Sequence, residues 1–90
     1  MGRKTIHLKS KERRGRSDLA AFFRELADKI ERNDVVLQQG TDEVRLDLPE
    51  SVEFEVEVEE KEKRSGSEFE IELEIEWHEQ EKKDEQVSLG

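Results

Sequence analysis

Residues 51–77 read SVEFEVEVEEKEKRSGSEFEIELEIEW, and this stretch decides the fold because apolar residues occupy nearly every second position. Alternation with a period of two sends successive side chains to opposite faces of a β-strand. We therefore predict one strand at Val52–Glu59 and a second at Phe69–Trp77, joined by a tip around Arg64-Ser65-Gly66-Ser67. The two strands form an antiparallel hairpin with one apolar face and one face of glutamates.

The numbering of this hairpin restricts how its two strands can pair. Apolar residues are even-numbered on the first strand and odd-numbered on the second, so only registers whose paired numbers have an odd sum unite the apolar faces. Absent a bulge, every such register also sets glutamate opposite glutamate. Each like-charged pair costs up to about 1 kcal/mol, whereas each buried apolar side chain gains about 1.5–3 kcal/mol. We therefore expect the hairpin to form, with its apolar face buried and its acidic face in water.

Three interpretations of the acidic face are open. The favoured one is a solvated surface that prevents edge-to-edge aggregation. The second is a docking surface for a basic partner. A divalent-cation site is the least favoured, because glutamates at strand spacing form a row and calcium requires converging oxygens. The candidate acidic face comprises Glu53, Glu55, Glu57, Glu70, Glu72, Glu74 and Glu76.

Upstream of the hairpin, the spacing predicts a helix from about residue 18 to 32, with Ser17 as its N-cap and Asn33 as a left-handed C-cap. Short strands are predicted at residues 5–9, 35–38 and 44–48. The apolar face of the helix comprises Leu19, Phe22, Phe23, Leu26, Ala27 and Ile30. The fold class is therefore α+β in the order β-α-β-β-β-β, with one largely antiparallel sheet and the helix packed on its apolar face.

Charge is unevenly distributed along the 90 residues. Residues 1–16 carry seven basic side chains against one acidic one, a net charge of +6. Because the whole chain has a net charge of −9, residues 17–90 together carry −15. Such asymmetry is typical of a basic arm for nucleic acid or of two regions that attract each other, and we favour the second. The acidic remainder disfavours nucleic acid as a partner. The candidate basic contact comprises Lys9, Lys11, Arg13, Arg14 and Arg16.

Catalytic and cofactor-binding patterns are weak in this sequence. It has no cysteine and two histidines that lack a second ligand at metal-binding spacing, and its five glycines form no phosphate-binding loop. Ser17 is better explained as a helix cap than as a nucleophile. We predict that the chain is not an enzyme and has no catalytic residue, metal site or cofactor.

The domain organisation that we predict is one small domain at residues 1–78 followed by a polar, disordered tail at residues 79–90. No apolar run approaches the length of a membrane span, and no signal peptide is recognisable, so we expect a cytoplasmic protein that does not contact membranes. The expected function is a non-catalytic binding module that acts through protein–protein contacts. Its partner is unknown, and a homodimer is one option; contact of residues 9–16 with nucleic acid or phosphate is the alternative.

On these residues, the sequence resembles the Amphi-Trp domain family of small bacterial and archaeal proteins. The matching segments are LAAFFRELADKI at residues 19–30, VRLDLPESVEFEVEVEEK at residues 44–61 and FEIELEIEW, which ends at Trp77. With the first strand, the resemblance covers residues 5–77. It implies that Trp77 is the signature position, and it implies no activity, cofactor or catalytic residue. The basic residues 9–16 are not implied by the resemblance.

Overall fold

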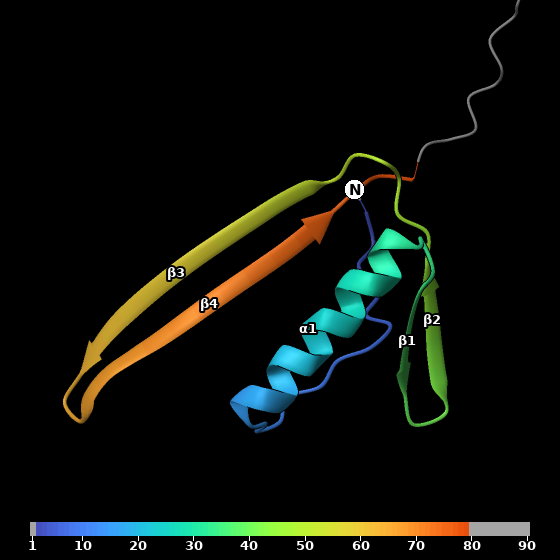
Figure 1. The fold of residues 1–90 in the computed structure, drawn as a ribbon. Helices are drawn as coiled ribbons and strands as arrows, with labels where there is room; N and C mark the ends of the chain where they lie inside the picture. Colours follow the sequence, from blue (N-terminus) through green and yellow to red (C-terminus); the bar gives the residue numbers. More distant parts are fainter. Residues whose placement is uncertain (1, 80–90) are drawn as a thin grey trace, which may run out of the picture. The chain divides into compact units, whose positions relative to one another are not determined.

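The computed structural model describes residues 2–79, in which one helix precedes four strands (Figure 1). Helix α1 spans Arg16–Glu31, and the strands are β1 at Val35–Gln39, β2 at Asp42–Leu46, β3 at Glu53–Lys63 and β4 at Gly66–Glu76. Strand β1 pairs with β2 and β3 pairs with β4, both antiparallel. The predicted α+β class with antiparallel pairing is confirmed.

The chain divides into two compact units, Met1–Leu48 and Pro49–Gly90. The first holds α1, β1 and β2, and the second holds β3 and β4. The predicted tail begins at residue 79, and from residue 80 onward it lies outside the described residues. Within residues 2–79, no helix is long and apolar enough to cross a membrane.

Helix α1 begins two residues earlier than the sequence predicts. Gly15 is the N-cap, with no side-chain capping bond, and Ser17 lies inside the helix, so the prediction for Ser17 is wrong. The cause is that the backbone carbonyl of Gly15 already accepts the first helical hydrogen bond, from the Leu19 N–H at 3.0 Å. At the other end Asn33 adopts a positive φ of 53°, and the N–H of Asp34 donates to the Lys29 carbonyl. The predicted left-handed conformation at Asn33 is confirmed, with Arg32 as the C-cap.

In the first unit, the β1–β2 sheet pairs apolar residues with apolar residues on one face. Val35 lies opposite Leu46, and Leu37 lies opposite Val44. Val35 is buried, with 3% of its surface exposed, and the other three are half-buried. Helix α1 contacts β1, so this sheet has a cover within its own unit. Gly40 supplies the tight turn between the strands with a φ of 60°.

In the second unit, β3 and β4 run eleven residues each and pair in an unbroken register (Figure 1). Phe54 lies opposite Ile75, and Glu55 lies opposite Glu74, so the paired numbers have an odd sum as the apolar alternation requires. Both strands are longer than predicted, so the turn between them consists of only Arg64 and Ser65. Gly66, the first residue of β4, has a φ of 125°. The predicted glutamate-to-glutamate pairing is confirmed.

Two finer points of the predicted topology differ in the structure. Residues 5–9 form no strand; Ile6 is exposed, and the segment is tied down by the Gln39 side-chain amide, which donates to the Lys9 carbonyl at 2.9 Å. Five residues with two apolar side chains gain little without a ladder partner. The four strands also form two separate two-stranded sheets, because alternation determines which face of a strand is apolar but not which edges pair.

Candidate interaction surfaces

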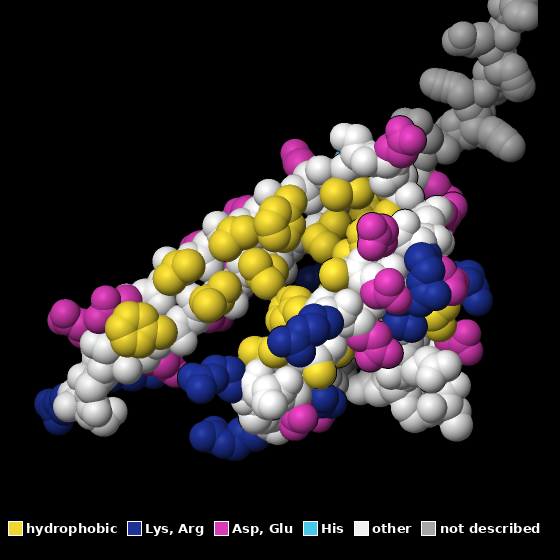
Figure 2. Space-filling model, viewed as in Figure 1, with side chains coloured by type: hydrophobic (Ala, Val, Ile, Leu, Met, Phe, Trp, Pro, Cys, Tyr) yellow, Lys and Arg dark blue, Asp and Glu magenta, His cyan; other side chains and the backbone are white. Residues whose placement is uncertain are grey.

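The most exposed apolar surface in either unit lies on the β3–β4 hairpin. Val58, Ile71 and Phe69 are 69%, 68% and 67% exposed. None of the residues of β3 and β4 is buried. Figure 2 shows hydrophobic side chains gathered along one face of this hairpin, with acidic side chains at its margins. We define the hairpin apolar face as Phe54, Val56, Val58, Phe69, Ile71, Leu73 and Ile75.

This exposure corrects one sequence prediction and leaves another intact. The apolar residues do share one face of the hairpin, as predicted, but within their own unit they form no buried core, contrary to the prediction. A two-stranded sheet has only one layer, so it cannot cover its own apolar face. The sequence pattern shows which residues form the apolar face of the hairpin. Whether that face is buried depends on another sheet or helix packed against it, which the pattern does not identify.

The opposite face of the hairpin carries the predicted row of carboxylates. Glu53 pairs with Glu76, Glu55 with Glu74, Glu57 with Glu72 and Glu59 with Glu70. Opposed residues in antiparallel strands have Cβ atoms only about 5 Å apart, so these carboxylates repel one another. We define this surface, made of those eight residues, as the glutamate wall. Its proposed role as a docking surface stays a prediction.

Repulsion within the glutamate wall is strongest at Glu72. The neighbouring charge of Glu70 raises the pKa of the Glu72 carboxyl above its ordinary value of 4.5, and Glu57 across the ladder adds to the shift. The charged form of Glu72 is therefore disfavoured in the folded hairpin relative to the unfolded chain. The raised pKa of Glu72 therefore reflects the repulsion between carboxylates that accompanies the pairing of β3 with β4.

Cations at the tip of the hairpin end the glutamate wall, a feature that the sequence reasoning missed. Lys61 lies opposite Glu68, and the Lys63 ammonium lies 2.8 Å from the same carboxylate. The odd numbers of both lysines place them on the same face as the glutamates. The parity argument, carried beyond Glu59, would have placed both lysines on the face of the glutamates. The hairpin is thus acidic at its base and along its length, and mixed in charge at its tip.

The basic segment 9–16 lies ahead of α1 in the first unit. Arg14 pairs with Glu12 through a 3.3 Å contact, and Arg16 is the first residue of the helix. All of its basic side chains are exposed. The segment has no regular structure before Arg16, and its role in contacting an anion stays a prediction.

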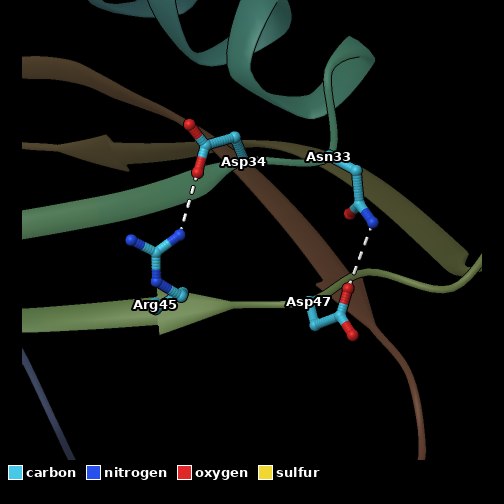
Figure 3. A network of polar contacts seen from close by, with 4 residues as sticks. All are labelled: Asn33, Asp34, Arg45 and Asp47. Atoms are coloured by element: carbon cyan, nitrogen blue, oxygen red, sulfur yellow. Dashed lines mark hydrogen bonds and ion pairs between the residues drawn. The ribbon is translucent and has the colours of Figure 1, made fainter.

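Polar contacts in the first unit hold the end of α1 against the end of β2 (Figure 3). The Arg45 guanidinium donates to the Asp34 carboxylate at 2.9 Å, and the Asn33 amide donates to the Asp47 carboxylate at 3.1 Å. Arg45 lies on β2 and Asp34 lies just ahead of β1, so the pairing of β1 with β2 brings the two side chains together.

A shallow depression lies between α1 and β1, lined by Phe22, Leu26, Lys29 and Leu37 among others. Phe22 contacts Phe23 edge-to-face, with ring centroids 5.8 Å apart, and both residues are more than two-fifths exposed. These are the side chains that the sequence assigned to the core face of the helix. The polar lining of the depression comes from Glu25, Lys29 and Gln38.

Trp77, the predicted signature residue, directly follows the last residue of β4 and is half-buried. Its odd number continues the parity of the apolar residues of β4. Over the described residues, no three His, Cys, Asp or Glu side chains come together in a way that could hold a metal ion.

Comparison with known proteins identifies the family. A family model described as the Amphi-Trp domain matches residues 1–90, the whole chain. The chain belongs to the Amphi-Trp domain family, as the sequence resemblance predicted. Neither the curated proteins nor the solved structures contain a match.

Proposed function

We propose that this protein is a non-catalytic binding module that acts through protein–protein contacts, with the hairpin apolar face as its contact surface. The observation that carries the proposal is the exposure of seven large apolar side chains on one face of one hairpin. Each large side chain presents roughly 100 Å² at these exposed fractions, so the face amounts to about 700 Å². A contiguous apolar patch of this size on a small protein is typical of an interaction site.

The charge around the face favours a protein over a lipid surface. The glutamate wall lies on the reverse of the same two strands, and the chain carries a net charge of −9. Membrane surfaces are commonly anionic and repel such a hairpin. A protein partner that covers the apolar face leaves the wall in water, where its carboxylates stay hydrated.

The experiment that tests the proposal is a pull-down with three forms of the full chain as bait: the wild type, a double threonine variant and a control variant. Val58→Thr combined with Ile71→Thr keeps β-branched residues, and therefore strand propensity, but adds hydroxyl groups to the face. Glu57→Gln alters the opposite face of the same strand and serves as the matched control. We expect the same bound protein on the wild-type and Glu57→Gln baits and its loss from the threonine variant. Equal retention on all three baits would contradict the proposal.

The alternative, contact of the basic segment 9–16 with nucleic acid or phosphate, rests on five exposed basic side chains near the start of α1. It predicts binding to a single-stranded oligonucleotide that weakens steeply with salt, because each neutralised phosphate releases a counterion. Replacing Arg13, Arg14 and Arg16 with alanine then abolishes binding. An affinity that is independent of salt would remove this alternative.

A further inference from the structure

We infer that the occupant of the hairpin apolar face is the same face of a second copy of this chain, stacked so that the tip of each hairpin lies over the base of the other. This inference rests on the proposed function, since it names the partner of the same surface. Area, the placement of like charge, and the charge difference between tip and base support it in turn.

The area of the face suits a partner of the same size. A stable protein–protein interface buries about 800 Å² on each side, and the hairpin apolar face offers about 700 Å². An isolated two-stranded hairpin is marginally stable in water, whereas two such sheets packed about 10 Å apart enclose a core. Stacking two copies therefore gives each hairpin the second layer that its own unit lacks.

The glutamate wall decides between stacking and edge pairing. Both β3 and β4 are edge strands of a two-stranded sheet, so a second copy could in principle extend the ladder. An extension that keeps the apolar faces together would set more glutamates opposite glutamates, for the parity reason that governs β3 and β4 themselves. Face-to-face stacking turns both walls outward, with two sheets between them.

Carboxylates on the apolar side of the tip determine how the two copies are oriented relative to each other. Glu60 and Glu62 are even-numbered residues of β3, so they lie on the same face as Phe54 and Val58. Stacking tip over tip would gather all four of these carboxylates from two copies at one end of the interface. Stacking tip over base separates them into two pairs at opposite ends, where water can reach them.

The distribution of charge along the outer face of the hairpin favours the same orientation. The tip carries Lys61, Lys63 and Arg64, while the base carries Glu53 and Glu76 with no basic residue between Glu53 and Glu59 or between Glu70 and Glu76. Tip-over-base stacking sets the basic tip of each copy across the two sheets from the acidic base of the other, so the two acidic bases lie at opposite ends of the dimer. In this arrangement β3 lies over β3 of the second copy, and the two-fold axis passes close to residue 57.

Sedimentation equilibrium of the full chain tests the association. We expect a mass close to twice 10.6 kDa at tens of micromolar protein, and a rise of at least tenfold in the dissociation constant for the Val58→Thr, Ile71→Thr variant. Glu57→Gln should dimerise at least as tightly as the wild type. Because each copy carries a net charge of −9, raising the salt concentration should tighten the dimer. A dimer that ignores the threonine substitutions, or that dissociates in salt, would overturn the inference.

Spin labels test the orientation cleanly, because the chain has no native cysteine. Single cysteines replace Glu53, Glu57 or Lys61, which lie on the outer face at the base, centre and tip. At about 3.4 Å per residue, same-site labels at positions 53 and 61 lie roughly 27 Å apart along the strand in the tip-over-base dimer, and labels at position 57 are nearest. Equal distances at all three sites would mean tip-over-tip stacking and would overturn the inference.

The failure of this inference is distinguishable from failure of the proposed function. A chain that stays monomeric, yet retains another protein only when the apolar face is intact, overturns the second-copy inference and leaves the proposed function standing. A monomer whose protein contacts are unchanged by Val58→Thr and Ile71→Thr overturns both. Far-UV circular dichroism of every variant establishes that the strands persist.

Discussion

The two hairpins of this chain differ in how their apolar faces are covered. Strands β1 and β2 are five residues long, contact α1 within their own unit, and include the buried Val35. Strands β3 and β4 are eleven residues long, and none of their residues is buried. Both hairpins follow the same antiparallel pairing rule. The difference indicates that alternation is sufficient to form a hairpin but that a second layer is needed to stabilise one.

Charge differs between the hairpins in the same sense. In the first unit, Arg45 of β2 pairs with Asp34, an opposite charge that lies just ahead of β1. In the second unit, four glutamate pairs face each other across the ladder. The β3–β4 hairpin thus has a higher electrostatic cost and less apolar burial, so it has more to gain from a partner.

The largest expected effect on stability comes from the same substitution made at one valine in each hairpin. Val35→Thr places a hydroxyl at a buried site and should lower the free energy of unfolding of the first unit by about 2 kcal/mol. Val58→Thr makes the same change at an exposed site and should cost less than about 0.5 kcal/mol in dilute protein. Urea unfolding of each variant measures both values. Equal costs would contradict the claim that the apolar face of β1–β2 is covered and that of β3–β4 is not.

The second effect concerns the glycines in the two turns. Gly66 has a φ of 125°, which side chains rarely adopt, so Gly66→Ala should destabilise β3–β4 by about 1 kcal/mol even though a Cβ there would meet no atom within 4 Å. Gly40 has a φ of 60°, a conformation that asparagine tolerates, so Gly40→Asn should cost little in β1–β2. Thermal unfolding followed by circular dichroism compares the two; a neutral Gly66→Ala would refute the strain argument.

The third effect sharpens the electrostatic side of the comparison. Because repulsion raises the pKa of Glu72, the folded hairpin binds its proton more tightly than the unfolded chain does. Stability from this group is therefore present below the ordinary value of 4.5 and is lost as the pH rises through the raised pKa. Glu72→Gln should raise the stability of β3–β4 at pH 7 and reduce the gain seen on acidification. Denaturant unfolding at pH 4.5 and pH 7 checks both, and a variant less stable than the wild type at pH 7 would exclude net repulsion.

The smallest effect belongs to the exposed ion pair in the first unit. Arg45→Met should destabilise β1–β2 by no more than about 0.5 kcal/mol, since both side chains are more than half exposed. A double-mutant cycle with Asp34→Asn isolates the pair energy from changes in strand propensity. A coupling above about 1 kcal/mol would mean that the pair, rather than cover by α1, distinguishes the two hairpins.

Much of the fold could be predicted from the sequence where local periodicity decides it. The odd-sum register of β3–β4, the left-handed Asn33 and the antiparallel pairing all follow from spacing and residue type. The N-cap was misplaced because the Gly15 carbonyl needs no polar side chain to begin the helix. The single five-stranded sheet was wrong because edge pairing depends on contacts distant in sequence, which one alternating pattern does not encode.

The candidate site divides in the same way. That glutamates face glutamates could be predicted, because parity requires it in every odd-sum register, whereas the individual pairs come from the structure. The exposed apolar face could not, because the sequence marks Phe54 or Ile71 as suited to burial without saying which layer buries it. The lysines at the tip were within reach of the parity argument, had the strand been extended past Glu59. The basic segment 9–16 remains a prediction in both its proposed roles.

Hydrogen exchange measured over a range of protein concentrations tests the central claim most directly, namely that a second copy of the chain covers the hairpin apolar face. We predict that the amides of β3 and β4 become better protected as the concentration of the chain rises, because association supplies their second layer. The amides of β1 and β2, covered by α1 in their own unit, should not change. Protection of β3 and β4 that is the same at every concentration, in the full chain without added partner, would contradict the account.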